Sequence, residues 1–350
     1  MAVIADKAGG GDCRYVIIGA GAIGGTVGAV LQRAGVSTTL VARGQHAAVL
    51  AAQGLTLRTP DGAFRIPVTS ASSPEQVRLT PSDVLVFATK TQQLDAALAE
   101  WADRPVHGPN GAVGAAGDLL PAMTALNGVA AEDKALRYFH RVFGICVWLP
   151  AVHLQPGEVI VRSWPVVGQF QIARWPAALT TPADRDLLAR LADSWGAGGI
   201  AVRPVADVAP WKYSKLLGNL GNAVGALCAD DVNDVVAAAR REGEDVLHTA
   251  GIEFTSFEAS AADLTAGLVI REVPGFAGGP SNSTWQSFSR RTGDVETDFL
   301  NGEIVRLAHR HGVEAPLNSA LARAVRTAVR EGLGPNPHTA ARLRELVGIA

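Results

Sequence analysis

One stretch near the start of the chain decides the fold: Arg14-Tyr-Val-Ile-Ile-Gly19-Ala-Gly21-Ala-Ile-Gly24. Its apolar beginning is typical of a buried strand, and residues 22–34 have the pattern of a helix. The glycines therefore fall at the strand-to-helix corner, where a tight turn, close approach of a ligand to the backbone and close helix–strand packing each favour glycine. The first helical turn then offers backbone N–H groups and the helix dipole to an anion. This predicts a dinucleotide-binding turn formed by Gly19, Gly21, Ala22, Ile23 and Gly24.

The next predicted strand, residues 37–42, ends on Arg43. In proteins that prefer NAD, an acidic residue at this place accepts hydrogen bonds from the ribose hydroxyls, whereas a guanidinium pairs with a 2′-phosphate. Arg43 therefore favours NADP(H) as the cofactor. The alternative is a surface arginine that only ends a strand.

The composition of the chain is that of a globular protein. Its 350 residues are 48% hydrophobic and 18% charged, which is enough for two domains with cores of their own. A net charge of −2 argues against nucleic acid or an anionic membrane as a partner. We find no apolar run of about 18 residues and no signal-peptide core. The three cysteines lack metal-ligand spacing, so we expect reduced thiols, no metal site and a cytoplasmic protein.

We predict an α/β, Rossmann-type dinucleotide-binding domain over residues 14–206, followed by an all-helical substrate and catalytic domain over 207–350, with 1–13 as a flexible leader. The first domain continues with a helix at 45–53, a β-hairpin turning at 60–62, a strand at 84–88, an irregular connection at 101–118, a strand at 123–126, β-rich segments at 142–150, 158–162 and 166–172, a helix at 185–195 and a strand at 200–203. From Trp211 onward the pattern is helical, apart from a break at 274–283.

Two polar segments follow predicted strands of the first domain. The strand at 84–88 leads into Lys90 and Gln92, and the strand at 123–126 leads into Asn127. Ligands of open α/β sheets bind at the carboxyl ends of the strands, so all three are candidate cofactor contacts. A solvated loop is the alternative for Lys90.

Lysine is rare in this chain, with five lysines among 31 basic residues, so each lysine is a candidate for a specific functional role. Lys215, Asn219 and Asn222 stand at i, i+4 and i+7, at offsets of about 0°, +40° and −20° on a helix of about 100° per residue. A cation and two carboxamides in apolar surroundings suggest the wall of a polar cleft. A buried hydrogen-bond network that fixes helix packing is the alternative.

Ser283 and Glu296 follow the break in the helical domain. If this segment folds back toward a cleft, they offer a hydroxyl and a carboxylate to a polar substrate. Helix capping by Ser283 and a solvated Glu296 are the alternatives.

In their order and spacing, these residues resemble the ketopantoate reductases (2-dehydropantoate 2-reductases) over nearly the whole chain, from Arg14 to about Arg326. The motifs that carry the resemblance are Gly19-Ala-Gly-Ala-Ile-Gly24, Arg43, Lys90-Thr-Gln92, Leu126-Asn127-Gly128, Lys215 with Asn219, and Ser283-Thr-Trp-Gln286 through Glu296.

The resemblance implies NADPH-dependent reduction of ketopantoate to pantoate, a step of pantothenate biosynthesis. It implies these roles: Lys215 catalytic, Glu296 facing the substrate hydroxyl, Asn219 and Ser283 binding substrate, and Asn127 and Lys90 on the cofactor side. In such a reaction an ammonium stabilises the charge that grows on the carbonyl oxygen and supplies the proton, so Lys215 is the candidate general acid, helped by Glu296. We expect Asn222 to assist Asn219 in orienting the substrate.

The chain departs from the family pattern on the substrate side. Ala223 stands where the family has a second helix asparagine, with Asn222 one position earlier, and Ser287 replaces a frequent aspartate. The segment between Ser283 and Glu296 is one residue longer than usual, and the 101–118 connection also looks longer. These changes bear on the identity of the substrate more than on the type of reaction.

Other functions stay open at this point. A related reductase of another 2-oxo acid, an opine-type imine reductase and a catalytically silent NADP(H)-binding sensor would share the cofactor turn. A 6-phosphogluconate type of dehydrogenase would need more basic residues than Lys212 near Lys215. Apolar positions of the last helices serve either internal packing or a homodimer interface: Leu307, Val313, Leu317, Leu321 and Val325.

Overall fold

The computed structural model describes residues 13–255, 267–276, 282–290, 293 and 295–349. So far as these are described, the chain forms two compact units. The sheet unit comprises Met1–Leu126, Ala130–Val208 and Leu264–Ala277, and the helical unit comprises Asn127–Val129, Ala209–Asp263 and Gly278–Ala350. The predicted leader lies almost wholly outside the described residues, as does part of the predicted break at 274–283.

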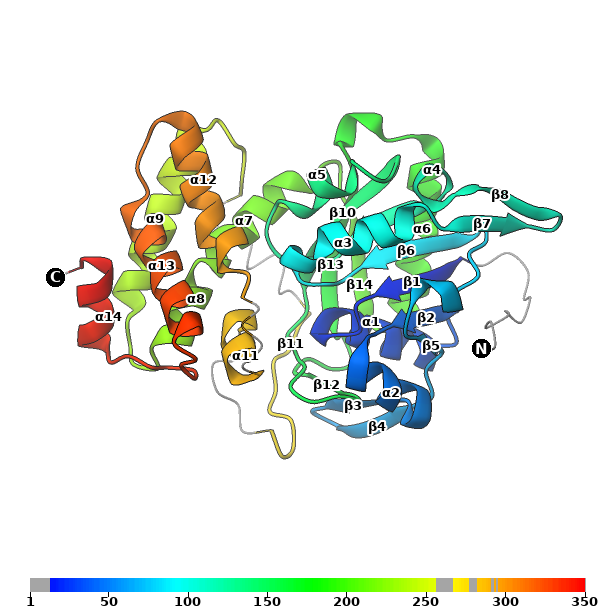
Figure 1. Ribbon diagram of the computed structural model, residues 1–350, viewed down its shortest axis with the longest axis horizontal. Coiled ribbons are helices and arrows are strands. Elements are labelled where there is room, and N and C mark those ends of the chain that lie inside the picture. Colours follow the sequence, from blue (N-terminus) through cyan, green and yellow to red (C-terminus); the bar gives the residue numbers. More distant parts are fainter. Residues whose placement is uncertain (1–12, 256–266, 277–281, 291–292, 294, 350) are drawn as a thin grey trace. The chain divides into compact units, whose positions relative to one another are not determined.

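The sheet unit is built on an eight-stranded sheet with the order β14-β13-β10-β9-β6-β1-β2-β5. Its strands are parallel except for the antiparallel pair β10 and β13. Their bounds are β1 (Arg14–Ile18), β2 (Thr38–Val41), β5 (Ser70–Ala71), β6 (Asp83–Phe87), β9 (Pro121–Thr124), β10 (Arg141–Trp148), β13 (Gly168–Trp175) and β14 (Ile200–Pro204). The predicted α/β, Rossmann-type architecture is confirmed (Figure 1).

Helices accompany this sheet, and two smaller sheets complete the unit. The helices are α1 (Ala22–Arg33), α2 (Gly44–Gln53), α3 (Thr91–Ala102), α4 (Ala116–Leu119), α5 (Ala131–Ala135) and α6 (Pro182–Ala197), with the 3₁₀ turns η1 (Pro74–Gln76) and η2 (Ala177–Leu179). The smaller sheets are β11-β12-β3-β4, made of β11 (Ala151–Val152), β12 (Glu158–Val161), β3 (Leu55–Thr59) and β4 (Gly62–Ile66), and β7-β8, made of β7 (Pro105–Gly108) and β8 (Gly111–Ala115).

The register of β1 with its neighbours sets the edge of the sheet that matters for ligands. Ile18, the last residue of β1, is paired with Val41 of β2 on one side and Phe87 of β6 on the other. Three strand ends therefore lie together, and the chain continues from them into Gly19, Ala42 and Ala88. Because β2 and β6 flank β1 on opposite sides, this is a switch point of the doubly wound sheet, where ligands bind in such folds.

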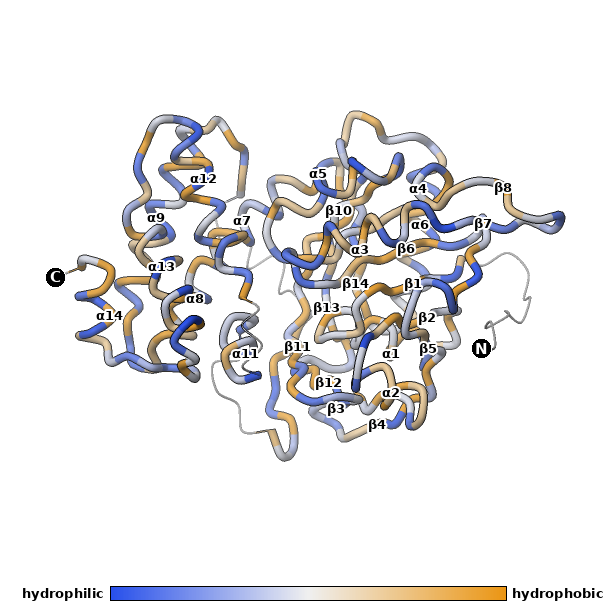
Figure 2. The backbone as a smooth tube through the Cα atoms, in the orientation of Figure 1, coloured by the Kyte–Doolittle hydropathy of each residue, from blue (hydrophilic) through white to orange (hydrophobic). Residues whose placement is uncertain are grey.

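The core of this unit explains why its strands are so apolar. All five residues of both β1 and β6 are buried, as expected for parallel strands that are covered on both faces. Figure 2 shows these strands among the hydrophobic stretches of the tube. Two clusters of buried side chains, one including Ile17 and Trp195 and the other Val16 and Trp101, contain alternate residues of β1.

The predicted irregular connection at 101–118 is wrong. This segment contains the end of α3, the antiparallel ribbon β7–β8, which extends from the unit in Figure 1, and α4. The small residues of the segment give no apolar periodicity. The ribbon is fixed instead by contacts with a distant part of the chain, since the amide of His107 donates to the carbonyl of Leu79 (2.8 Å) and the side chain of Val106 is fully buried.

The helical unit has the helices α7 (Ala209–Asn219), α8 (Gly221–Leu227), α9 (Asn233–Thr249), α11 (Ser283–Arg290), α12 (Asn301–His311), α13 (Pro316–Arg330) and α14 (Ala340–Val347), with the 3₁₀ turn η3 (Thr297–Phe299). Their apolar faces meet in one core that includes Leu217, Leu220 and Leu321. The predicted helical C-terminal domain is confirmed. No helix within the described residues is both long and apolar enough to cross a membrane.

The sequence pattern predicted one continuous helix through Lys215 and Asn222, and this is wrong. The helix is interrupted at Leu220, so Lys215 and Asn219 belong to α7 while Asn222 belongs to α8. Asn301 holds the interruption, because its side-chain amide donates to the carbonyl of Leu220 (3.1 Å) and to Asn318 Oδ1 (2.9 Å). An asparagine that is distant in sequence thus decides where the helix breaks.

Candidate active site

The glycine turn after β1 has the geometry that its sequence predicts. Gly19 has φ +101°, and a Cβ built there would lie 2.8 Å from the carbonyl oxygen of Ala88. A Cβ on Gly24 would lie 2.0 Å from the carbonyl oxygen of Gly19. Both positions therefore require glycine, the first for its backbone conformation and the second for the close approach of α1 to the turn.

Gly21 requires no glycine for internal packing, because a Cβ built there would meet no atom within 4 Å. It is the N-cap of α1, it offers no capping side chain, and the first turn of α1 has no acidic residue. Open space in front of an uncapped helix N-terminus suits the phosphates of a dinucleotide. Gly21, Ala22 and Ile23 therefore form the helix N-terminus at which we predict the anion site.

A cavity of about 170 Å³ in the sheet unit lies at the ends of β1, β2 and β6. The predicted Arg43 lines it, together with Gly19 of the turn. Sequence reasoning missed its other polar lining residues, His46, Ser73, Thr89, Gln93 and Glu100. Thr89 follows β6 directly and could have been found from that position, whereas Glu100 lies at the far end of α3 and carries no local signal.

Two observations at this cavity bear on the ligand it accepts. Within the part of the chain that the structure describes, the buried hydroxyl of Thr89 has no hydrogen-bond partner, which leaves it for a ligand. The guanidinium of Arg43, whose side chain is 71% exposed, forms an ion pair with Glu100. A solvent-exposed ion pair contributes little free energy, so an anion can replace the carboxylate.

Lys90 and Gln92 lie beside this cavity in sequence but are not among the residues that line it. Lys90 is the N-cap of α3, and Gln92 lies in its first turn. Thr89 and Gln93 occupy the cavity wall at this end of α3 instead. Lys90 and Gln92 stay predicted cofactor contacts.

Lys215 and Asn127 meet in the helical unit. The ammonium nitrogen of Lys215 donates to Oδ1 of Asn127 at 2.8 Å, across 88 positions of sequence. Asn127 follows β9, yet the segment Asn127–Val129 belongs to the helical unit. The two residues were predicted separately, one as a catalytic and the other as a cofactor-side residue, and the fold brings them into direct contact.

The same segment contacts the turn that follows Glu296. Gly128 has φ +78°, and a Cβ built there would lie 2.8 Å from the carbonyl oxygen of Phe299, the last residue of η3. Glu296 is buried and immediately precedes η3. Asn127–Gly128 therefore joins Lys215 on α7 to the segment that carries the predicted carboxylate.

Asn219 and Ser283 share a feature that suits ligand-binding residues. Among the described residues, neither the side-chain nitrogen of Asn219 nor the hydroxyl of Ser283 has a hydrogen-bond partner, although both atoms are buried. Helix capping does not account for Ser283, because Oδ1 of Asn282 accepts from the amide of Trp285 (2.9 Å) at the start of α11. A buried polar atom without a hydrogen-bond partner destabilises the folded protein, unless a ligand forms a hydrogen bond with it.

Asn222 lies in the first turn of α8, the helix against which α11 packs. The interruption at Leu220 separates its helix from the one that carries Lys215 and Asn219, and Asn222 stays a predicted substrate-binding residue. The apolar surroundings that the sequence indicates are buried, and they comprise Leu216, Leu217, Leu220, Val224 and Leu227.

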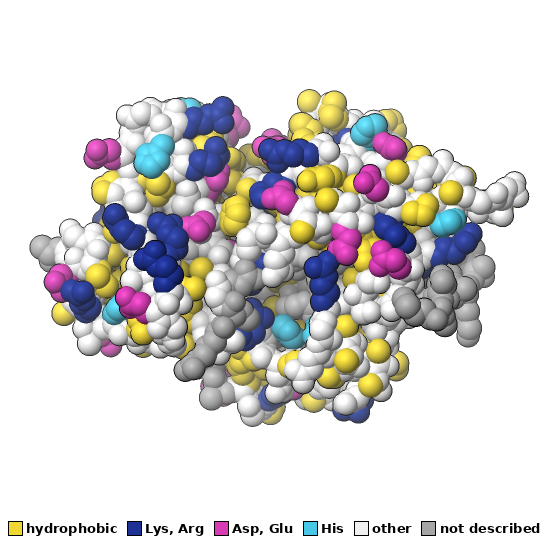
Figure 3. Space-filling model, in the orientation of Figure 1, with side chains coloured by type: hydrophobic (Ala, Val, Ile, Leu, Met, Phe, Trp, Pro, Cys, Tyr) yellow, Lys and Arg dark blue, Asp and Glu magenta, His cyan; other side chains and the backbone are white. Residues whose placement is uncertain are grey.

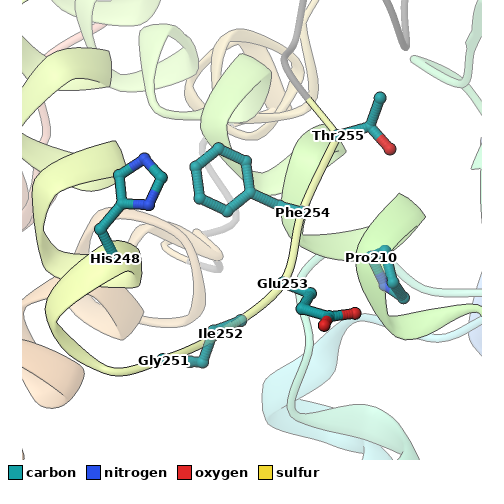
Figure 4. Close-up of a pocket in the computed structure, with 7 residues that line it drawn as sticks. All are labelled: Pro210, His248, Gly251, Ile252, Glu253, Phe254 and Thr255. Atoms are coloured by element: carbon teal, nitrogen blue, oxygen red, sulfur yellow. The ribbon is translucent and has the colours of Figure 1, made fainter.

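A second cavity, of about 480 Å³, lies in the helical unit at the end of α9 (Figure 4). The imidazole of His248 and the ring of Phe254 have centroids 5.0 Å apart, and Glu253 extends to the other side of the segment, toward Pro210. None of the predicted site residues is among those that line it. On the face shown in Figure 3, basic and acidic side chains are interspersed.

Comparison with known proteins was made on sequence and on structure. Residues 15–176 match the family described as ketopantoate reductase PanE/ApbA, and residues 207–329 match its C-terminal domain. The 2-dehydropantoate 2-reductase of Pyrococcus horikoshii is 25% identical over 331 residues, covering 92% of this chain and 98% of that protein. That of Caulobacter vibrioides is 28% identical over 308 residues, covering 87% of this chain and 94% of that protein.

Solved structures share the fold. A ternary structure of D-mandelate dehydrogenase with NADH and anilino(oxo)acetate superposes with a TM-score of 0.71 at 18% identity, over 91% of this chain and 99% of that one. A PanE/ApbA family ketopantoate reductase from Ralstonia eutropha superposes with a TM-score of 0.69 at 23% identity, over the same shares of the two chains, 91% and 99%.

Proposed function

The chain belongs to the ketopantoate reductase family, and from this premise we propose that it reduces 2-dehydropantoate (ketopantoate) to pantoate with NADPH. Membership makes it an NADP-dependent oxidoreductase that acts on a CH–OH group and its oxidised carbonyl form. The identity of the 2-oxo acid and the roles of individual residues are our proposal.

The observation that carries this proposal is the contact of Lys215 with Asn127 at 2.8 Å. A lysine at the polar face of α7 donates to a neutral carboxamide, and this contact orients its ammonium group. Asn219 lies one turn further along α7, with a buried and unsatisfied nitrogen. A cation beside an unsatisfied donor suits an anionic substrate with a carbonyl oxygen.

Residues of the sheet unit fit the cofactor. The turn from Gly19 to Gly24 would hold the diphosphate, and the hydroxyl of Thr89 would donate to the diphosphate or bond with a ribose hydroxyl. Arg43 would pair with the 2′-phosphate in place of Glu100. When bound, NADPH supplies the hydride that reduces the carbonyl carbon. Asn127 is the proposed contact on the nicotinamide side, and Lys90 and Gln92 stay candidates from sequence.

The protein residues then manage charge and orientation. As the carbonyl carbon is reduced, negative charge grows on its oxygen, and Lys215 stabilises this charge and transfers a proton from Nζ to that oxygen. Asn219 and Ser283 would bind the substrate carboxylate and oxo group, with Asn222 as a further candidate. Glu296 would accept a hydrogen bond from the substrate hydroxyl and help to keep Lys215 protonated.

A related reductase acting on another 2-oxo acid is the second candidate, because Ala223 replaces the second helix asparagine of the family pattern. A site without that carboxamide loses one polar contact with a hydroxylated substrate such as ketopantoate. Among the solved structures with this fold, one is a D-mandelate dehydrogenase, whose ternary structure contains a different 2-oxo acid compound.

The test is an NADPH-oxidation assay of the purified protein with ketopantoate beside pyruvate, 2-oxoisovalerate and benzoylformate. We expect kcat/KM for ketopantoate to exceed that for the others by at least about tenfold, which corresponds to about 1.4 kcal/mol of transition-state binding. A higher value for benzoylformate would support the second candidate. Tight NADPH binding without turnover of any oxo acid or imine would instead support a silent sensor.

We place this reaction in the cytoplasm, where the free thiols of Cys13, Cys146 and Cys228 would stay reduced. A homodimer formed through the helical unit is a further expectation, and light scattering of the purified protein would test it.

A further inference from the structure

His46, which the proposed mechanism does not use, contacts the glycine turn directly. It is the third residue of α2, and its imidazole lines the cavity that contains Arg43. Its Nε2 lies 2.8 Å from the carbonyl oxygen of Ala20, between the first two glycines of the turn. Its Nδ1 lies 2.9 Å from the amide nitrogen of Gly157.

These two contacts fix the protonation state of the imidazole. A backbone amide only donates, so Nδ1 must be an unprotonated acceptor for Gly157. A carbonyl oxygen only accepts, so Nε2 must carry the proton that is donated to Ala20. His46 is therefore neutral and a single tautomer, and each of its ring nitrogens has one partner.

Gly157 is a rigid anchor for this imidazole. It has φ +79°, and a Cβ built there would lie 2.3 Å from Cγ1 of Val49 on α2. Its carbonyl oxygen accepts from the amide of Thr56 at 2.8 Å. Gly157 is held in place by both α2 and β3. The imidazole of His46 therefore links the glycine turn to a fixed point of the sheet β11-β12-β3-β4.

The orientation of the Ala20 carbonyl affects the shape of the glycine turn. A Cβ on Gly25 would lie 2.7 Å from this oxygen, so the carbonyl is packed against the first turn of α1. Ala20 is bonded on either side to the glycines that set the turn. Rotation of the peptide between Ala20 and Gly21 would therefore change the direction of the amide of Gly21, the N-cap of α1.

We propose that neutral His46 is a positioning residue for the cofactor: by holding the carbonyl of Ala20, it keeps the glycine turn in the shape that binds the diphosphate. This inference rests on the proposed function, since it takes a dinucleotide as the ligand of the turn. It adds that protonation of His46 weakens cofactor binding, because a proton on Nδ1 would face the amide of Gly157.

The surroundings of His46 agree with a neutral ring. Burial lowers the pKa of His46, and the hydrogen bond to Ala20 opposes this only in part. The ring of His153 lies 4.6 Å away, between centroids, and Nδ1 of His153 is bonded to the carbonyl of Glu158 (2.9 Å). Arg43 and Glu100 line the same cavity and are paired with each other, and α2 itself has no charged residue.

The test uses ADP-ribose, which has the diphosphate but no 2′-phosphate. A phosphate monoester titrates near pH 6 and would obscure the effect of a histidine, whereas the diphosphate diester keeps its charge between pH 5 and 8. Binding to the full-length protein is measured by calorimetry from pH 5.0 to 8.0 for the wild type, His46→Gln and His46→Ala, with the exposed His311→Gln as the control.

At pH 7.5 we expect His46→Ala to bind ADP-ribose about fivefold to tenfold more weakly, the effect of about one hydrogen bond. His46→Gln, whose carboxamide can donate to Ala20 and accept from Gly157, should stay within about threefold of the wild type. Because burial lowers the pKa of His46, the affinity of the wild type and of His311→Gln should fall as the pH approaches 5.0, while that of His46→Gln stays flat. Long-range ¹H–¹⁵N spectra should show the proton on Nε2.

Parallel pH profiles of the wild type and His46→Gln would overturn the inference, as would unchanged binding by a folded His46→Ala. If His46→Ala does not fold, the pH comparison with His46→Gln still decides. Wild-type protein that binds ADP-ribose but reduces no oxo acid would overturn the proposed reaction and leave the role of His46 standing, so the two failures are distinguishable.

Discussion

Two cations, Arg43 and Lys215, are the side chains on which the proposed reaction depends most, and their surroundings differ. Arg43 is mostly exposed and pairs with a carboxylate that an anion can replace. Lys215 is half-buried and held by a carboxamide. The first arrangement suits the binding of a mobile phosphate, and the second suits a charge that must stay fixed while the substrate oxygen becomes negative.

Lys215→Ala should lower kcat with ketopantoate by about 10² or more, because the developing charge loses both its stabilising cation and its proton donor. The Kd of NADPH should change little. Stopped-flow oxidation of NADPH and fluorescence titration give the two quantities. Lys134→Ala, which removes a lysine paired with Asp95 in the sheet unit, is the control. Normal turnover in the Lys215 variant would remove that residue from the mechanism.

Arg43→Ala should weaken NADPH binding far more than NADH binding, since only NADPH has the 2′-phosphate. Glu100→Gln should have the opposite effect and increase the affinity for NADPH by about threefold. In this variant no carboxylate competes for Arg43, and none repels the 2′-phosphate. Fluorescence titration with both cofactors measures these changes. Equal losses of NADPH and NADH in the arginine variant would contradict a contact with the phosphate.

At the scale of elements, helix ends and interruptions position the polar groups of this protein. The interruption at Leu220 places Lys215 on α7 and Asn222 on α8, and the side-chain amide of Asn301 donates to the carbonyl of Leu220 from another helix. The start of α6 is fixed by a capping box in which Thr181 and Asp184 bond each other's backbone amides. Asp184 also contacts Arg141 (2.8 Å) and Arg174 (3.8 Å), which joins this helix to β10 and β13.

Asp184→Asn should lower the free energy of unfolding by about 3 kcal/mol, because it leaves the buried Arg174 without its counter-charge. Urea denaturation at neutral pH measures the loss. Asp186→Asn changes an exposed carboxylate on the same helix and should cost less than about 0.5 kcal/mol. Equal effects of the two substitutions would show that Asp184 acts as a surface charge.

At the scale of the whole molecule, each unit has its own hydrophobic core, and polar groups are buried within the core of the sheet unit. Tyr15 is one of them. It is fully buried on β1, its hydroxyl is bonded to Ser194 (2.8 Å), and its ring lies edge-on to Trp195 at 5.5 Å. Burial, the largest cause, raises its pKa to about 12, although the bond to Ser194 acts against this.

The stability of the sheet unit should therefore fall at alkaline pH. Between pH 10 and 12 the unfolded chain loses the tyrosine proton while the folded chain keeps it, so unfolding becomes easier by up to about 2.7 kcal/mol. Tyr15→Phe has no such proton and should lose less stability over this range. Urea denaturation of both proteins at pH 9, 10 and 11 measures the difference. Equal slopes would contradict a tyrosine that stays neutral in the folded state.

Local patterns predicted much of the fold. The order of strands and helices around the glycine turn, the hairpin of β3 and β4, and the helical C-terminal half all follow from apolar periodicity and turn residues. The β7–β8 ribbon and the break at Leu220 were missed because contacts with Leu79 and Asn301, far away in sequence, create them. Local signals do not contain such partners.

The sequence by itself determined the glycine turn, the strand that precedes it and the place of Arg43, because each depends on backbone conformation and on residues that are neighbours along the chain. Only the tertiary structure decided that Lys215 meets Asn127, that Glu100 competes for Arg43 and that His46 holds Ala20. The hydrogen bond of His46 with Ala20 joins residues 26 positions apart, and that of Lys215 with Asn127 joins residues 88 positions apart. The physical reason is that hydrogen bonds and ion pairs depend on distances of a few ångströms, which are set by packing and not by order in the chain.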